Sequence, residues 1–319
     1  MPRNLLIFFL FILFFSCSEE DKKEEEIAQI QVPMEISRFD QRFSRATVDS
    51  LPALKRDFPY LFPKQYPDEL WVEKMQDTIQ LQLNAAVKQE FPHLQQTELE
   101  LENLFQHIKY YFAQTKIPKV VTLTSEVDYR NKIIWADTLL LVSLDTYLGQ
   151  EHPLYLGVQE YIKKGMNKSQ LIPDVATAFG ETVVPKPESR NFLAHMIYYG
   201  KLLYLQDLLL PAASDARKMG YTPEEMQWAQ KNEEQIWRYF VENELLFSSD
   251  SELYTRFLYP APFSKFYLQL DNEAPPRLGQ YIGWQMLRKY MEKTEASVPE
   301  MLQADAQTIF EKANYKPKK

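Results

Sequence analysis

The sequence predicts an α+β fold that is predominantly α-helical and carries a small antiparallel sheet. Apolar residues recur at helical spacing through most of the chain, whereas runs rich in β-branched and aromatic residues occur only in its middle. The chain has 20 prolines and only 8 glycines, a balance typical of helices joined by proline-bounded loops. Many helices beside two or three strands define an α-rich α+β domain.

Residues 1–16 are predicted to be a lipoprotein signal peptide. Arg3 supplies a positive start, and residues 5–15 form an unbroken apolar run that is too short for a spanning helix, which needs about 20 residues. Ser16 and Cys17 resemble a lipobox, in which signal peptidase cleaves before a cysteine that carries diacylglycerol, although Phe14 stands where Leu is usual. We expect lipidation of Cys17. An ordinary secretory signal with an incidental cysteine is the alternative.

Residues 17–32 are predicted to be a charged, flexible tether. Ser18 is followed by eight charged residues that offer nothing apolar to bury. This acidic start resembles the signal that sends some lipoproteins to the outer surface of the cell, but a soluble spacer explains the same residues. The membrane leaflet that holds the anchor therefore stays open.

Residues 33–319 are predicted to form a single α-rich globular domain. The apolar spacing indicates amphipathic helices over residues 71–91 and 97–112. His107 lies beside the apolar stripe of the second helix, where we expect a buried structural histidine. A short helix is also expected around Ile36, Phe39 and Phe43, which share helical spacing.

Strands are predicted for residues 119–125 and 132–145, and helices resume after Gly180. The strand segments are rich in β-branched residues and are flanked by helix breakers, so they are expected to pair as the small antiparallel sheet. Thr222, Pro223 and Glu225 form a capping-box pattern, which predicts a helix start. Further helices are expected over residues 191–208, 278–293 and 298–312, and the G-x-x-x-G of residues 279–283 predicts a close packing contact.

The composition excludes several classes of function. The formal charge of -8 and a pI near 5.3 argue against a nucleic-acid partner, because binding phosphates needs a basic face. A single cysteine permits neither an internal disulfide nor a cysteine-based zinc cluster. No Walker loop, G-x-G-x-x-G motif, G-x-S-x-G elbow or EF-hand loop occurs, so we predict no cofactor.

One helix resembles part of a zinc-peptidase site. His195 sits among apolar residues like the first histidine of H-E-x-x-H, and Glu234 lies in the next long helix, where some zinc peptidases place a third ligand. Met196 replaces the general base and Tyr199 replaces the second histidine, so two protein ligands remain where catalytic zinc uses three. An ordinary core histidine and a solvated glutamate are favoured over a metal site, while a degenerate zincin-like scaffold stays open as the ancestry of the fold.

Seven segments together resemble the gliding motility lipoprotein GldB family of gliding, flagellum-free Gram-negative bacteria. They are RFDQRF at 38–43, FPYLFP at 58–63, LDTYLG at 144–149, MIYYGKLLYLQDLLLP at 196–211, GYTPEEMQWAQKNEEQIWRYF at 220–240, APFSKF at 261–266 and PPRLGQYIGWQMLRKYM at 275–291. The resemblance implies a non-catalytic lipoprotein of the cell envelope. It also implies a requirement in gliding and in the protein secretion coupled to it, with other proteins of these machines as partners. Cys17 is the one functional residue that it carries over.

Three hypotheses of function follow. The first is an accessory lipoprotein, not an enzyme, anchored by its lipid in the inner or outer membrane and facing the periplasm or the surface. The second is a divergent zincin-like metallopeptidase or metal-binding lipoprotein that uses His195 and Glu234. The third is a lipoprotein that binds a ligand in an aromatic pocket, which an enclosed cavity of useful size would support.

Overall fold

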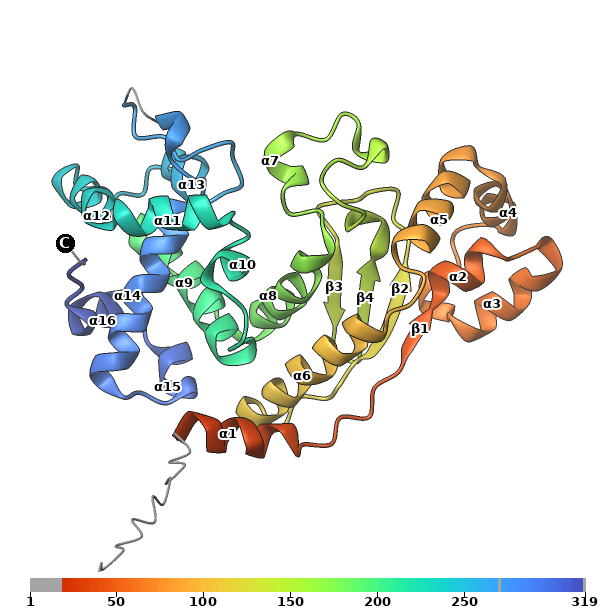
Figure 1. Cartoon of the computed structure of the whole chain (residues 1–319), viewed down its shortest axis with the longest axis horizontal. Coiled ribbons are helices and arrows are strands. Elements are labelled where there is room, and N and C mark those ends of the chain that lie inside the picture. Colours follow the sequence, from red (N-terminus) through yellow and green to blue (C-terminus); the bar gives the residue numbers. More distant parts are fainter. Residues whose placement is uncertain (1–18, 269–270, 318–319) are drawn as a thin grey trace, which may run out of the picture.

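The fold is predominantly helical and carries one small sheet, which confirms the predicted fold class (Figure 1). The computed structural model describes residues 19–268 and 271–317. In the first half of this part the α-helices are α1 (Glu19–Ala28), α2 (Phe39–Ser44), α3 (Leu51–Asp57), α4 (Asp68–Gln76), α5 (Thr78–Glu90), α6 (Gln95–Tyr111) and α7 (Glu160–Lys163). They continue with α8 (Leu171–Val183), α9 (Phe192–Leu209), α10 (Asp215–Met219), α11 (Pro223–Lys231), α12 (Glu233–Glu242), α13 (Glu252–Phe257), α14 (Leu278–Thr294), α15 (Val298–Gln303) and α16 (Ala306–Ala313).

The sheet is mixed, which corrects the expectation of antiparallel pairing alone. Its strands are β1 (Ile36–Arg38), β2 (Lys119–Leu123), β3 (Ile133–Ala136) and β4 (Leu139–Ser143), in the order β1-β2-β4-β3. Only β3 and β4, the two halves of the predicted 132–145 strand, pair antiparallel, through a tight turn at Asp137. The pairs β1–β2 and β2–β4 are parallel. Parallel partners are joined by long connections, so local sequence patterns do not reveal them.

The two faces of the sheet cover two separate hydrophobic cores. Successive side chains of a strand point to opposite faces. Val120 accordingly joins the larger core with the helices α6, α8, α9 and α14, whereas its neighbour Val121 joins a smaller core of phenylalanines and leucines from α2, α3 and the following turn. In Figure 1 the helices of the smaller core lie on one side of the sheet, and α8 and α9 lie on the other.

Part of the expected tether is folded, which corrects that prediction for residues 19–32. Residues 19–28 form α1, which packs along α6, and Ile27 and Val32 are buried. The buried His107 side chain contacts Glu24 through Nε2 at 3.1 Å and the carbonyl oxygen of Asn103 through Nδ1 at 2.8 Å. The prediction of a structural histidine is therefore confirmed. The apolar residues that hold α1 follow the charged run, so the run alone gives no sign of its packing.

Helices α9 and α14 cross at very short range through two glycines. A Cβ atom added to Gly200 would lie 2.5 Å from the carbonyl oxygen of Gly283, and one added to Gly283 would overlap the carbonyl group of Met196. Gly279, at the other end of the predicted G-x-x-x-G segment, leaves similar room for the carbonyl oxygen of Phe257, 2.9 Å from an added Cβ. The predicted close contact is confirmed. Within the described residues, no helix combines the length and the apolar character that crossing a membrane requires.

Candidate functional site

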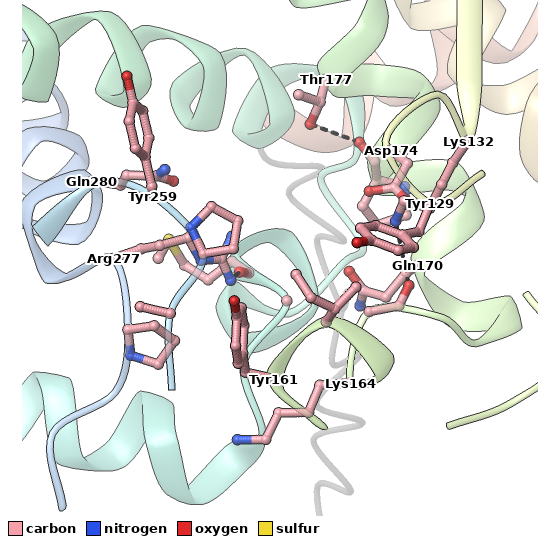
Figure 2. A pocket seen from close by; sticks show the side chains of 18 of the residues that line it. Tyr129, Lys132, Tyr161, Lys164, Gln170, Asp174, Thr177, Tyr259, Arg277 and Gln280 are labelled. Carbon is pink, nitrogen blue, oxygen red and sulfur yellow. Dashed lines mark hydrogen bonds and ion pairs between the residues drawn. The ribbon is translucent and has the colours of Figure 1, made fainter. Parts of the chain in front are cut away.

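A cavity of about 830 Å³ lies between the sheet-bearing half of the chain and the C-terminal helices. Its walls come from the loop before β3, from α7, α8, α9 and α10, and from the start of α14. Figure 2 shows Arg277, Gln280 and Tyr259 on one side of this space and Lys132 and Asp174 on the other. Its volume falls within the range of sites for small ligands.

On one wall of the cavity, Lys132, Asp174 and Tyr147 contact one another. The Lys132 ammonium ion-pairs with the carboxylate of Asp174, which also accepts a hydrogen bond of 2.8 Å from the hydroxyl of Tyr147. Burial raises the pKa of Tyr147 well above its ordinary value, with the Asp174 charge acting in the same direction. The tyrosine therefore stays protonated and the positive charge of Lys132 is already balanced.

The opposite wall carries an arginine without a carboxylate partner. Arg277 directly precedes α14 and has a φ of 60°, a left-handed conformation that is uncommon for residues other than glycine. Its guanidinium donates to the carbonyl oxygen of Met219 and lies 5.6 Å from the ring centroid of Tyr221. Across residues 19–268 and 271–317, no Asp or Glu forms an ion pair with it.

A buried glutamine presents an unused acceptor at the wall formed by α9. Gln206 is 2% exposed, and its Nε2 donates to Oγ1 of Thr177 at 3.1 Å. The Thr177 hydroxyl in turn donates to the carbonyl oxygen of Pro173 at 3.0 Å, so it can only accept from Gln206. This chain fixes the orientation of the amide and leaves Oε1 of Gln206 without a partner in the described part of the chain. A buried unpaired carbonyl oxygen is costly, so it marks a place where a donor is expected.

An ion pair joins the segment after α7 to α11, close to Tyr161 (Figure 2). The Nζ atom of Lys164, just after α7, lies 2.7 Å from Oε1 of Glu225 on α11. Glu225 also closes the capping box with Thr222, which confirms the predicted start of α11. The contact fixes α7 relative to α11 and completes the wall of the cavity.

The family model described as gliding motility protein GldB matches residues 20–317 of the chain. The chain belongs to the GldB family. This membership associates it with gliding motility and, as a lipoprotein, with the cell envelope. No characterised protein and no solved structure matched the chain.

In this GldB-family chain, His195 and Glu234 belong to no group of side chains among the described residues that could hold a metal ion. His195 is half-buried on α9 and packs against the ring of Tyr254, with the ring centroids 4.5 Å apart, and burial lowers its pKa. Glu234 lies in the first turn of α12, and neither it nor His195 lines the cavity. Among the residues that the structure describes, no group of three His, Cys, Asp or Glu side chains is placed to hold a metal ion.

Tyr199 is the one predicted candidate that lines the cavity of this GldB-family protein. Burial raises its pKa to about 12, so its hydroxyl is neutral near pH 7. Cys17 and the predicted signal peptide lie outside the described residues.

Sequence reasoning missed Gln206, Lys132 and Arg277. One signal was present for Gln206, because α9 is apolar on all sides and a helix of that kind is mostly buried, so a polar residue within it is a candidate for burial.

Proposed function

We propose that this GldB-family chain is a non-catalytic lipoprotein that is anchored by a lipid on Cys17 and acts through contacts with other proteins of the gliding machinery and of the secretion coupled to it. The observation that carries the proposal is the family match over residues 20–317. Two features of the cavity support a non-catalytic role. Lys132 and Lys164 are each paired with a carboxylate, and Tyr199 is held in its neutral form, so none of these groups is activated as a nucleophile or base.

The proposed anchor lies close to the folded body. Cys17 precedes Glu19, where α1 begins, by two residues, which span at most about 7 Å. Because α1 packs on α6, a lipid on Cys17 holds the body itself near the membrane. The loops next to α7 and after α13 lie at the end of the molecule opposite α1 (Figure 1). That end is therefore directed away from the membrane, toward other proteins.

Exposed apolar side chains on these two loops support a role in protein contacts. Leu156, before α7, is 95% exposed, and Tyr267 and Leu268, after α13, are 68% and 62% exposed. Exposed apolar residues occur elsewhere on the described surface too, so it is the position of these three at the end opposite α1 that leads us to assign them to a partner.

Metabolic labelling with a palmitate analogue tests the anchor. We expect the wild-type chain to be labelled and membrane-bound, and the Cys17→Ala variant to be unlabelled and released. A wild-type chain that stays unlabelled contradicts the anchor.

Complementation of a deletion strain tests the contacts. Leu156→Ser combined with Leu268→Ser should reduce colony spreading and protein secretion at unchanged protein level. Leu99→Ser, at a 57% exposed position on α6, is the matched control and should have no effect. Equal spreading and secretion in both strains would count against these loops as a contact surface.

A further inference from the structure

Within the described residues, the cavity contains an arginine without an acidic partner, Arg277, and a buried acceptor without a donor, Oε1 of Gln206. They lie toward different ends of the α9 face that lines the cavity. Tyr199 and Gln206 both line the cavity from α9 and are seven residues apart, which corresponds to about 10 Å along a helix. Figure 2 shows Arg277 beside Tyr259 and Gln280, across the space from Thr177, which accepts the hydrogen bond of Gln206. Glu181 also lines the cavity, and its negative charge raises the pKa of Tyr199 while that of Arg277 lowers it. The cavity thus offers a cation at one end and a buried acceptor about two turns of helix away.

The charge of the cavity favours an anion. Five Lys or Arg side chains and three Asp or Glu side chains line it, and one of the five, Lys218, is paired with Asp207 outside the lining. The pairs Lys132–Asp174 and Lys164–Glu225 are also balanced, so Arg130, Arg277 and Glu181 remain and the walls keep one net positive charge. Of the two arginines, Arg277 is fixed by its bond to the carbonyl oxygen of Met219, and we take it as the residue that receives a carboxylate or a phosphate.

The other end of the cavity favours a hydrogen-bond donor. Because Thr177 fixes the amide of Gln206, its Oε1 can only accept, and an alcohol of a ligand would satisfy it. Tyr129, Tyr161 and Tyr259 add aromatic faces with polar tips, which suit rings that are apolar on one face and hydroxylated at the edge.

The lining argues against an extended peptide as the ligand. None of the strands in the described residues contributes a side chain to the cavity, so a peptide backbone cannot pair with a sheet edge there. Recognition has to come from side chains alone. That arrangement favours a compact, hydroxylated molecule.

We propose that this cavity binds a short saccharide that carries an anionic group, with the anion against Arg277 and a hydroxyl donating to Oε1 of Gln206. The anion is a carboxylate or a phosphate, since both accept from a guanidinium in the same way. The site gives the chain a ligand in addition to its proposed anchor and protein partners. The proposed binding site does not depend on the anchor or on the protein partners.

Calorimetric titration of the full-length chain in detergent tests this inference. The probes are digalacturonate for a carboxylate, glucose 1-phosphate for a phosphate, maltose as a neutral disaccharide, trialanine as a peptide and inorganic phosphate alone. We expect one of the two anionic saccharides to bind at least tenfold more tightly than maltose, trialanine and inorganic phosphate. The preferred anionic saccharide identifies the anion.

Variants separate binding from folding. Arg277→Gln should weaken the anionic saccharide by roughly thirtyfold, and Arg277→Lys should recover most of that loss. Gln206→Leu should weaken binding by about fivefold and raise the melting temperature of the free chain, because it removes a buried unpaired oxygen. If Gln206 only stabilised the fold, the Gln206→Leu variant would instead melt at a lower temperature than wild type. Arg238→Gln, at an exposed site on α12, is the control and should leave binding unchanged.

Three results overturn the proposal. One is the absence of heat from either anionic saccharide at 10 mM. Another is tighter binding of trialanine than of both saccharides. The third is equal binding of inorganic phosphate and of the saccharides with no effect of Gln206→Leu, which would reveal an adventitious anion site only.

Discussion

The crossing of α9 and α14 allows a sharp test of the packing, because glycines at different positions have very different surroundings. In Gly283→Ala, the new methyl group would overlap the carbonyl group of Met196, which belongs to the backbone of α9 and moves only if the helix moves. Forcing extra volume into a packed contact costs about 1–3 kcal/mol, and a backbone obstacle places this site at the upper end. Alanine regains about 1 kcal/mol of helix propensity. We therefore expect a net loss of about 2 kcal/mol in the free energy of unfolding.

Gly165→Ala is the matched control. The nearest atom to a Cβ built there is the carbonyl oxygen of Ile162 at 3.7 Å, which is ordinary contact, so the substitution should be neutral or stabilise the fold by about 0.5 kcal/mol. In thermal unfolding followed by circular dichroism, the Gly283→Ala variant should melt about 4 °C lower than wild type, and Gly165→Ala at or above it. Equal melting temperatures for the two variants would show that the helices do not cross this closely.

Three further outcomes are expected. Burial lowers the pKa of Lys201 from 10.5 to about 8 in the folded chain. As the pH rises, the folded chain therefore loses the Lys201 proton before the unfolded chain does. The contribution of Lys201 to the free energy of unfolding consequently increases between these two pH values. In chemical denaturation, the stability of wild type relative to Lys201→Met should therefore grow by about 2 kcal/mol from pH 7 to pH 9.5, and a constant difference contradicts this. Thr222→Ala should cost about 1 kcal/mol in the same assay, because it removes the cap of α11, whereas no loss would mean that the cap is unimportant. His195→Ala should leave the zinc content of the purified chain unchanged by elemental analysis, and loss of stoichiometric zinc would revive the metal-site hypothesis.

The features that were predictable from sequence are those governed by residues close together in the chain. The capping box at Thr222 depends on residues three apart, and the close contact at Gly279 and Gly283 depends on small residues four apart on one helix face. The predicted helix over residues 71–91 failed for a related reason. Asp77 sits inside its apolar pattern, but its side chain accepts from the backbone N–H of Gln80 and starts α5 there, so the segment is two helices. A local cap overrode the periodic pattern.

The cavity was not predictable, because its parts meet only through long-range packing. Arg277 and Gln206 are 71 positions apart, and Lys132 is in the other half of the molecule. No motif joins them, and each residue type is common on protein surfaces. The zinc-site hypothesis named Tyr199, which lines the cavity, but it also named His195, which packs on Tyr254, and it did not include Gln206.

The position of α1 relates the proposed anchor to the cavity. A flexible tether of 16 residues would let the body sample every orientation above a membrane, whereas residues 19–28 form a helix that packs on the body. The His107–Glu24 contact and the buried Ile27 hold α1 on α6, and α6 packs on α8, which supplies Asp174 and Thr177 to the cavity. Helix α1 and the cavity are therefore connected by continuous packing, so the lipid that we propose on Cys17 would act on a body in which the cavity has a defined position relative to α1.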